Sequence, residues 1–383
     1  MMELNMDLII KFLLLGVLSV AGQDFNQDAM MEVFGVPPPL PGTNDTCMLQ
    51  SGGEGRCMPR HLCDDTTLNK TTTVRVHQEC QFILDKCCPI IKEDKTPDLD
   101  YAYDEVDLSC GKHNSNGISM RILNKDNSET KFGEFPWIVA VLMKEQRKHG
   151  KFKITYKGAG SIIHPEVVLT AAHITGSAMR VRAGEWDSST NDEQFVHEDV
   201  DVGEIVVHER YTPQRKNMHY DIALLILLWP LTLSHHVGVV CLPPPGTART
   251  PAETRCLAAG WGKDTFGKYQ NELKKVELPV VDRRSCKSLL RQTRLGRHFK
   301  LHQSFMCAGG EEGRDTCKGD GGAPLVCPMP DENDRYVQNG IVSWGIGCGE
   351  KDVPSVYTDV TFLRPWIDAQ MKARNFVTSF YTY

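Results

Sequence analysis

Short apolar runs dominate the chain from residue 110 onward. Each run is rich in β-branched or aromatic side chains and is bounded by glycine, proline or aspartate, which favour turns. The runs occupy residues 137–143, 167–171, 205–207, 222–228 and 340–344. Many short strands with few helical patterns predict an all-β barrel or sandwich for this part of the chain.

One helical pattern stands at the end of the chain. Leu363, Trp366, Ile367 and Met371 recur at the spacing of a single helical face. We therefore expect a C-terminal amphipathic helix.

The first residues follow a different pattern. A mainly apolar run at 8–21 is followed by Gly22 and Gln23. Its length suits the apolar core of a secretory signal and is short for a bilayer span, so we assign 1–22 as a signal peptide. A buried helix or an uncleaved anchor is the alternative. Every later apolar run is broken by charge, glycine or proline, so the mature chain is expected to be soluble and extracellular.

Three segments without strand periodicity separate the signal from the strand-rich region. Residues 23–46 hold a proline-rich stretch and are interpreted as an arm. Residues 47–88 hold six cysteines and few large apolar side chains, so three disulfides, worth about 2–4 kcal/mol each, would stabilise them. Residues 89–118 form an acidic linker that is expected to be extended and solvated. Its acidic residues include Glu93, Asp94, Asp98, Asp100, Asp104, Glu105 and Asp107.

Fourteen cysteines and a formal net charge of −6 restrict the function further. An even number of cysteines indicates disulfide pairing in an oxidising compartment. Zinc binding is the alternative, but the sequence lacks the Cys-x-x-Cys pairs that such sites favour. The mild negative charge argues against a nucleic-acid-binding protein and gives no attraction to anionic membranes. Two Asn-x-Thr sequons, at Asn44 and Asn69, predict glycans or else unmodified surface asparagines.

Three motifs that carry catalytic chemistry in enzymes occur in a fixed order, with two tryptophan motifs between and after them. They are Leu-Thr-Ala-Ala-His at 169–173, Asp-Ile-Ala-Leu-Leu at 221–225, Gly-Trp-Gly at 260–262, Cys-Lys-Gly-Asp-Gly-Gly-Ala-Pro-Leu at 317–325 and Ser-Trp-Gly at 343–345. Together they resemble the chymotrypsin-like serine protease family over residues 119–375, about two thirds of the chain. The resemblance implies a double β-barrel followed by a C-terminal helix.

The resemblance assigns a role to each motif residue. His173 would be the general base, and Asp221 would orient its ring. The backbone amides of Gly319 and Gly321 would form an oxyanion hole, and Asp320 would bind a new N-terminus released by cleavage. Position 321 is where the family places its serine, and glycine has no hydroxyl to give up a proton. The chain is therefore expected to be an inactive homologue that retains at most a roughly 10³–10⁴-fold rate over water.

Other positions depart from the family pattern. The sequence has Gly322-Ala323 where the family usually has two glycines. Ile174 and Gly158 stand where the family usually forms a disulfide, so both halves of that bond are absent together. We expect the loop that carries His173 to lack this disulfide cross-link.

Two ligand sites follow from the resemblance as expectations. Asp315, Gly345 and Ser355 match a pocket for lysine or arginine, which is interpreted as an inherited vestige or, alternatively, as a site that binds without cutting. Glu185 and Glu193 match a calcium loop, although the loop here is shorter, and a solvated acidic loop is the alternative. No other cofactor is expected.

The same resemblance pairs the eight later cysteines without remainder. The expected disulfides are Cys110–Cys241, Cys256–Cys327, Cys286–Cys307 and Cys317–Cys348. The first of these bonds would tether the linker to the barrel.

A cleavage site is expected before the barrel. Arg121-Ile122 occupies the position of the activation bond in active relatives, although Leu123 and Asn124 replace the small residues usual there. Lys70, Arg75, Lys92 and Lys95 are alternative sites. We therefore expect cleavage within residues 70–122.

The six N-terminal cysteines end in an adjacent pair and resemble the arthropod clip domain. Its connectivity would be Cys47–Cys87, Cys57–Cys80 and Cys63–Cys88. A clip domain joined to a protease-like domain without its serine resembles the CLIP-A group of serine protease homologues, which includes masquerade-like proteins.

That resemblance implies a secreted, non-catalytic cofactor in haemolymph that supports prophenoloxidase activation and melanisation in innate immunity. The expected partners are clip-domain serine proteases, prophenoloxidase or other protease homologues, with oligomer formation after cleavage. One alternative is a recognition module that binds microbial surfaces or sequesters protease inhibitors. Another is a hydrolase with a substitute nucleophile, for which Thr170 and Thr316 are the near candidates in sequence.

Overall fold

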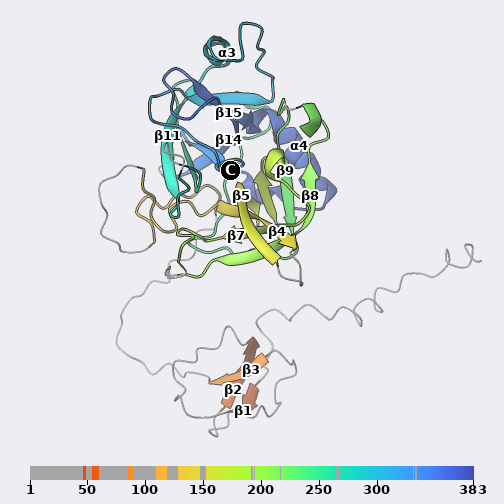
Figure 1. The fold of residues 1–383 in the computed structure, drawn as a ribbon. Coiled ribbons are helices and arrows are strands. Elements are labelled where there is room, and N and C mark those ends of the chain that lie inside the picture. Colours follow the sequence, from red (N-terminus) through yellow and green to blue (C-terminus); the bar gives the residue numbers. More distant parts are fainter. Residues whose placement is uncertain are drawn as a thin grey trace, which may run out of the picture. The chain divides into compact units, whose positions relative to one another are not determined.

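The chain of the computed structural model divides into two compact units, Met1–Ala102 and Tyr103–Tyr383 (Figure 1). The described residues are 46–48, 54–59 and 85–89, as backbone, and 109–118, 128–146, 152–190, 193, 195–215, 217–263, 268–330, 332 and 334–383. The predicted signal peptide, proline-rich arm, glycosylation sites Asn44 and Asn69 and cleavage site Arg121 lie outside the described residues.

The N-terminal unit contains a three-stranded antiparallel sheet with the order β1-β2-β3. Its strands are β1 (Thr46–Met48), β2 (Glu54–Pro59) and β3 (Asp85–Pro89). The register places Cys57 opposite Cys87. Cys63 and Cys80 lie outside the described residues, as do the side chains of all the cysteines in this unit. The three disulfides expected for the clip domain therefore stay a prediction.

Six strands close the first barrel of the larger unit, in the order β4-β5-β6-β9-β8-β7. They are β4 (Ile138–Gln146), β5 (Phe152–His164), β6 (Val167–Thr170), β7 (Met179–Ala183), β8 (Glu198–Val207) and β9 (Ala223–Leu227). Apolar and charged side chains alternate along β7, as the two faces of a strand require. Met179, Val181 and Ala183 are buried, whereas Arg180 and Arg182 are half-buried on the other face. Closure of the barrel leaves no free sheet edge.

Six further strands close the second barrel, in the order β10-β11-β12-β15-β14-β13. They are β10 (Arg255–Gly260), β11 (Lys274–Val281), β12 (Phe305–Gly309), β13 (Pro324–Pro328), β14 (Tyr336–Trp344) and β15 (Pro354–Asp359). Three disulfides fasten this barrel and its loops: Cys256–Cys327, Cys286–Cys307 and Cys317–Cys348.

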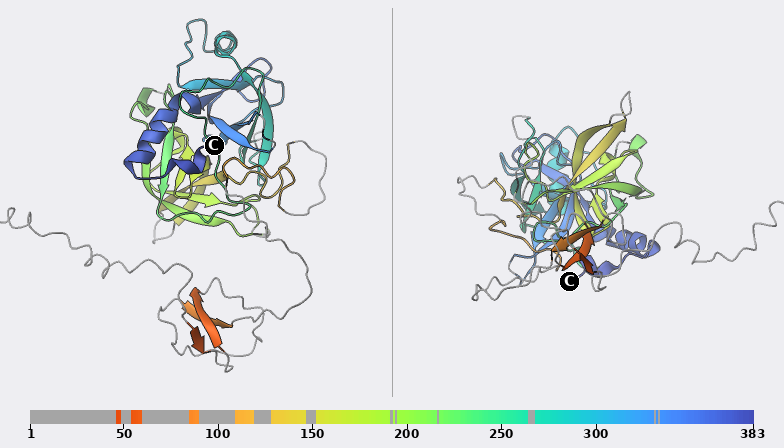
Figure 2. Two further views of the ribbon diagram at one scale, coloured as in Figure 1. Left: turned by 180° about the vertical axis from the view of Figure 1, so that it is seen from behind. Right: turned by 90° about the horizontal axis from the view of Figure 1, so that it is seen from below.

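The double β-barrel expected from the sequence is confirmed (Figure 2). Each of the five apolar runs overlaps a strand, namely β4, β6, β8, β9 or β14. Buried side chains such as Trp137, Leu224 and Leu325 fill the interior. Three motif residues lie beside these strands: His173 shortly after β6, Asp221 just before β9 and Gly321 just before β13, which positions the candidate site.

The C-terminal helix α4 (Val360–Ala373) is also confirmed. Leu363, Ile367 and Met371 are buried against the barrels, as the helical pattern predicts. Asp359 begins the helix by accepting a hydrogen bond from Phe362 N at 3.0 Å. Among the described residues, no helix is both long and apolar enough to cross a membrane.

A second helix, α3 (Arg283–Gln292), was not predicted from the sequence. Asp282 caps it by accepting from two backbone amides of the first turn. The helix buries only Cys286 and Leu290, and this sparse apolar pattern is too weak to predict a helix.

Candidate functional site

His173 and Asp221 form a hydrogen-bonded pair at the junction of the barrels. His173 lies in the short turn Ala172–Ile174 that follows β6, and Asp221 directly precedes Ile222 and β9. A 2.7 Å hydrogen bond joins His173 Nδ1 to Asp221 Oδ2, and the backbone N–H of His173 donates to Oδ1 at 2.8 Å. The two contacts fix both the ring and the backbone of the histidine.

Two hydroxyls from the second barrel hold Asp221 in place. Ser343 Oγ donates to Asp221 Oδ2 at 2.6 Å, and Thr358 Oγ1 donates to the backbone carbonyl of Asp221 at 2.8 Å. Asp221 is fully buried, and the hydrogen bonds from Ser343 and His173 satisfy a carboxylate that would otherwise be costly to bury. Neither role is evident from the sequence, although Ser343 stands in the Ser-Trp-Gly motif.

Gly321 lies directly in front of the free edge of the imidazole. A Cβ atom built on Gly321 would stand 2.6 Å from His173 Nε2 and 3.1 Å from Ile174 Cγ2. Position 321 thus faces the ring nitrogen that would act as a base, but glycine offers no hydroxyl there. The geometry for proton transfer is present without the proton donor.

The loop that carries Gly321 keeps a tightly defined backbone. Gly321 O accepts from Ala159 N at 3.0 Å, and Gly322 N donates to Val342 O at 2.9 Å. Gly322 has a φ of +83°, and a Cβ there would lie 2.2 Å from Thr170 Oγ1. Only glycine fits this position.

The two amides of the expected oxyanion hole, Gly319 and Gly321, belong to this loop. Gly319 O accepts a 3.0 Å hydrogen bond from the hydroxyl of Tyr156, which fixes the orientation of its peptide. Among the described turn and loop hydrogen bonds, none has the backbone N–H of Gly319 or Gly321 as its donor. The arrangement is compatible with an oxyanion hole.

Neither substitute nucleophile is in place. Thr170 is fully buried, and its hydroxyl donates to Ala159 O at 2.7 Å. The hydroxyl of Thr316 lies 3.0 Å from that of Tyr357. Both hydroxyls are therefore engaged in hydrogen bonds with groups other than the imidazole.

Ile174 fills the space of the missing disulfide. A Cβ atom on Gly158 would lie 3.0 Å from Ile174 Cδ1 and 2.2 Å from Gly321 O. Ile174 is buried, so an apolar contact replaces the covalent staple. The absence of the disulfide follows from the sequence, whereas this packing is evident only in the fold.

Asp320 places a carboxyl group between backbone amides. Its Oδ1 accepts from Gly262 N and its Oδ2 from Cys317 N, both at 2.9 Å. Burial, with a smaller contribution from Asp315, raises the pKa of Asp320 to about 6. No lysine, arginine or histidine of the described residues forms an ion pair with it, so the group carries an unbalanced negative charge at neutral pH.

The three expected pocket residues lie together. Asp315 accepts from Thr316 N at 2.8 Å and from Gly349 N at 3.1 Å, and burial raises its pKa. Ser355 hydrogen-bonds to Asp315, and its Oγ would lie 2.9 Å from a Cβ built on Gly345. The carboxylate of Asp315 therefore has several of its acceptor sites occupied.

Glu185 and Glu193 also lie together, and burial and Glu193 raise the pKa of Glu185 to about 7. Arg182 Nη1 lies 3.1 Å from Glu185 Oε2, and His197 Nδ1 lies 3.3 Å from the same oxygen. Calcium prefers six to eight oxygen ligands. Among the described residues, no group of three or more acidic, histidine or cysteine side chains is arranged to hold a metal. Calcium binding at this loop stays a prediction.

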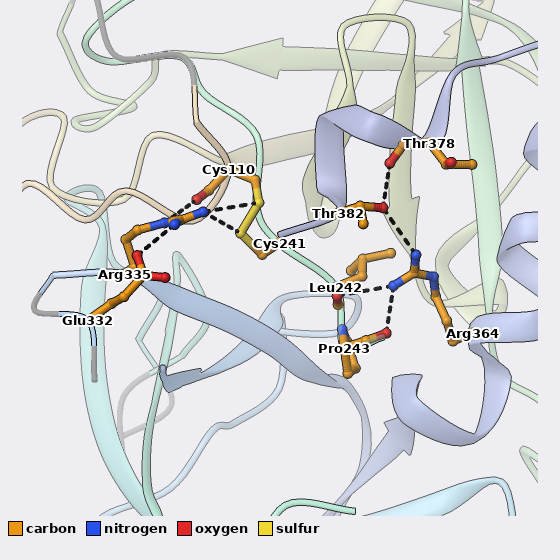
Figure 3. Close-up of a disulfide and its surroundings, with 9 residues drawn as sticks. All are labelled: Cys110, Cys241, Leu242, Pro243, Glu332, Arg335, Arg364, Thr378 and Thr382. Atoms are coloured by element: carbon orange, nitrogen blue, oxygen red, sulfur yellow. Dashed lines mark hydrogen bonds and ion pairs between the residues drawn. A yellow bond between two sulfur atoms is a disulfide. The ribbon is translucent and has the colours of Figure 1, made fainter. Parts of the chain in front are cut away.

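The disulfide Cys110–Cys241 joins the linker to the segment between the barrels (Figure 3). Arg335 Nε donates to Cys110 O at 3.1 Å and pairs with Glu332 at 2.6 Å. Beside it, Arg364 of α4 donates to two carbonyls of the same segment. A cut within 111–240 would leave both pieces covalently joined.

Comparisons with known proteins agree with this geometry. The family model described as Trypsin matches residues 125–367. Phenoloxidase-activating factor 2 of Galleria mellonella is 54% identical over 289 residues, which cover 73% of this chain and 94% of that protein. Inactive CLIP domain-containing serine protease A8 of Anopheles gambiae is 36% identical over 337 residues, covering 85% and 90%. The corresponding A28 protein of Anopheles gambiae is 35% identical over 342 residues, covering 82% and 88%.

Proposed function

Because the chain belongs to the trypsin family, and within it to the clip-domain serine protease homologues, we propose that it is a non-catalytic cofactor of an extracellular protease cascade. The observation that carries the proposal is the combination of an ordered His173–Asp221 pair with glycine at position 321. The imidazole is held for proton transfer, but no acyl-enzyme can form on glycine. What remains is a rigid protease surface that can bind proteins without cutting them.

The names of the relatives support one cascade in particular. The moth protein is called a phenoloxidase-activating factor, and the two mosquito proteins are called inactive CLIP proteases. We infer that this chain supports prophenoloxidase activation, and through it melanisation, in innate immunity. Secretion into haemolymph, expected from the signal peptide at 1–22, is part of the proposal. Its partners would be clip-domain proteases, prophenoloxidase or other protease homologues.

Cleavage would prepare the chain for this role. The carboxyl group of Asp320 accepts two amide hydrogen bonds and has no cationic partner in the described residues. A new amino terminus, released by a cut at Arg121 or a nearby basic residue, would supply that charge. The Cys110–Cys241 bond would then keep the N-terminal piece attached.

A reconstituted cascade tests the proposal. Prophenoloxidase and a catalytically active clip-domain protease are incubated with and without the full chain, while a fluorophosphonate probe reports any reactive serine. We expect phenoloxidase activity to rise with the added chain, and the chain itself to stay unlabelled. Labelling of the wild-type chain, or substrate turnover at a protease-like rate, would contradict the non-catalytic assignment.

A matched pair of variants tests the cleavage step. Asp320→Asn removes the carboxylate that would bind the new terminus and should abolish the stimulation. Glu312→Gln removes one exposed, unpaired carboxylate and should leave the stimulation unchanged. Equal stimulation by wild type and Asp320→Asn would show that the cofactor role does not depend on insertion of a new terminus.

A further inference from the structure

The helix α3 and the loop after it carry a dense group of positive charges. Residues 283–300 contain seven lysines and arginines and no carboxylate, although the formal net charge of the chain is −6. The nearest acidic residues along the chain are Asp282 and Glu311. Figure 1 shows α3 and this loop at the outer edge of the second barrel.

None of the seven cations forms an ion pair with a carboxylate among the described residues, although the neighbouring Asp282 interacts with the charge of Arg284. Arg283 is set apart because both of its terminal nitrogens donate to carbonyls, those of Phe305, Leu301 and His302. We call the other six the basic face: Arg284, Lys287, Arg291, Arg294, Arg297 and Lys300. Elsewhere on this barrel, Arg255 pairs with Glu311 at 2.7 Å. The positive charge of the basic face is therefore not balanced locally.

The cations of the helix lie along one side of it, and those of the following loop are exposed. Arg284, Lys287 and Arg291 recur three and four residues apart, which places them along one side of α3. The buried residues of the helix, Cys286 and Leu290, lie on a different side. In the loop the spacing of three residues continues through Arg294, Arg297 and Lys300, and all three are exposed.

The backbone beneath the basic face is fixed. The Cys286–Cys307 disulfide joins α3 to β12, and Asp282 caps the first turn. Arg291 Nε donates to Phe299 O at 2.9 Å, which holds the loop against the helix. A surface ordered in advance loses less entropy when it binds a ligand.

The apolar side chains of this region point inward. Leu295, Phe299 and Leu301 pack against the buried cluster around Phe305. No large apolar side chain between residues 282 and 302, all of them described, is exposed. Protein interfaces depend on aromatic or apolar anchors, membrane-bound helices insert apolar side chains, and single-stranded nucleic acids stack on exposed aromatic rings. The basic face offers none of these.

We propose that the basic face binds a sulfated polysaccharide. Four of its six cations are arginines, whose planar guanidinium groups bind the oxygens of sulfate or phosphate in pairs. The rest of the chain is net negative and would repel a wide polyanion such as a DNA duplex. A narrow, flexible glycan chain can follow the basic face and avoid the remaining surface. Such binding would concentrate the protein on extracellular matrix or on a sulfated cell surface.

Heparin is the probe that tests this assignment, with the full chain and its variants measured over a range of salt concentrations. The test variant carries Arg294→Gln, Arg297→Gln and Lys300→Gln. The matched control carries Lys153→Gln, Lys351→Gln and Lys372→Gln, three exposed lysines for which the described residues contain no ion pair. Both variants lose the same net charge.

We expect the test variant to lower the slope of log affinity against log salt by about two. Wild type should then lose roughly tenfold more affinity than the test variant between 50 and 200 mM salt. The control should bind like wild type. A second variant, Arg284→Gln with Lys287→Gln, probes the helical part and should also bind more weakly.

Three results would overturn the proposal. Equal weakening by the control would show that net charge alone governs retention. Failure of wild type to bind heparin at 50 mM salt would remove the glycan site. Tighter binding to duplex DNA or to anionic vesicles than to heparin at the same salt would assign the face to another class of ligand. Unchanged melting temperatures of the variants verify that the fold is intact.

Discussion

Replacing Gly321 with serine should turn this protein into a slow protease. The dyad that would activate a serine is already assembled, with His173 Nδ1 2.7 Å from Asp221 and a second hydrogen bond to the histidine backbone. Ser343 donates a hydrogen bond to the carboxylate of Asp221, and Thr358 donates one to its backbone carbonyl. The hydroxyl is the missing part.

The expected rate follows from the distance at position 321. A Cβ atom would stand 2.6 Å from His173 Nε2, whereas ordinary contact begins at 3.4 Å, so the ring must recede by about 0.8 Å. Misplacement of about 1 Å costs roughly 10²-fold in rate. Loss of a triad residue costs about 2 × 10⁶-fold in a well-studied protease, so Gly321→Ser should recover on the order of 10⁴-fold over wild type.

The assay uses the cleaved protein, an arginyl peptide substrate and a fluorophosphonate probe. Wild type should stay unlabelled, Gly321→Ser should be labelled slowly, and Gly321→Ser with His173→Ala should lose the label again. An unlabelled but folded and cleaved Gly321→Ser variant would refute the claim that the dyad is ready for catalysis. Turnover equal to that of an efficient protease would refute the steric estimate.

Three further predictions concern charge and covalent structure. Because the pKa of Asp320 is raised from 3.8 to about 6, its stabilising contribution is present below pH 4 and is lost as pH rises through 6. Chemical denaturation of the uncleaved protein measures this effect. Between pH 4 and 7 the free energy of unfolding of Asp320→Asn should rise by up to roughly 3 kcal/mol relative to that of wild type. A difference between the two proteins that does not change with pH would contradict this prediction. The pKa of Glu185 is likewise raised, to about 7, so its contribution to stability is also lost as pH rises. Glu185→Gln should therefore reduce the fall in the free energy of unfolding between pH 4.5 and 7. Millimolar calcium should leave the melting temperature of wild type unchanged. A calcium-dependent rise in that temperature would instead support a metal site. Wild type cut at Arg121 should run as one species on a non-reducing gel, whereas Cys110→Ser cut at the same bond should release the N-terminal piece. Release from wild type whose new N-terminus is Ile122 would refute the tether.

Several features could be predicted from the sequence because they depend on local patterns or on residue identity. Turn residues bound the apolar runs that became strands, and the spacing of Leu363, Ile367 and Met371 predicts α4. The loss of the nucleophile needs no coordinates, since glycine at 321 has no hydroxyl in any conformation.

Other features could not be predicted because they depend on neighbours that the sequence does not reveal. Glu185 and Glu193 match a calcium loop in the sequence, but the folded chain places Arg182 and His197 beside Glu185. A guanidinium next to a carboxylate pair offsets part of its negative charge, and only the folded chain reveals that contact.

The tertiary structure alone decided how the site is supported. Ser343 and Thr358 are separated from Asp221 by 122 and 137 positions, and closure of the barrels brings them to the carboxylate and its backbone. The same closure places Ile174 against Gly158, where packing replaces a covalent bond. Local sequence patterns describe which residues alternate or cap an element, whereas contacts between distant strands arise only from the way the barrels close. The sequence by itself therefore determined that the nucleophilic hydroxyl is missing at position 321. The fold determined that His173 and Asp221 remain hydrogen-bonded beside that position.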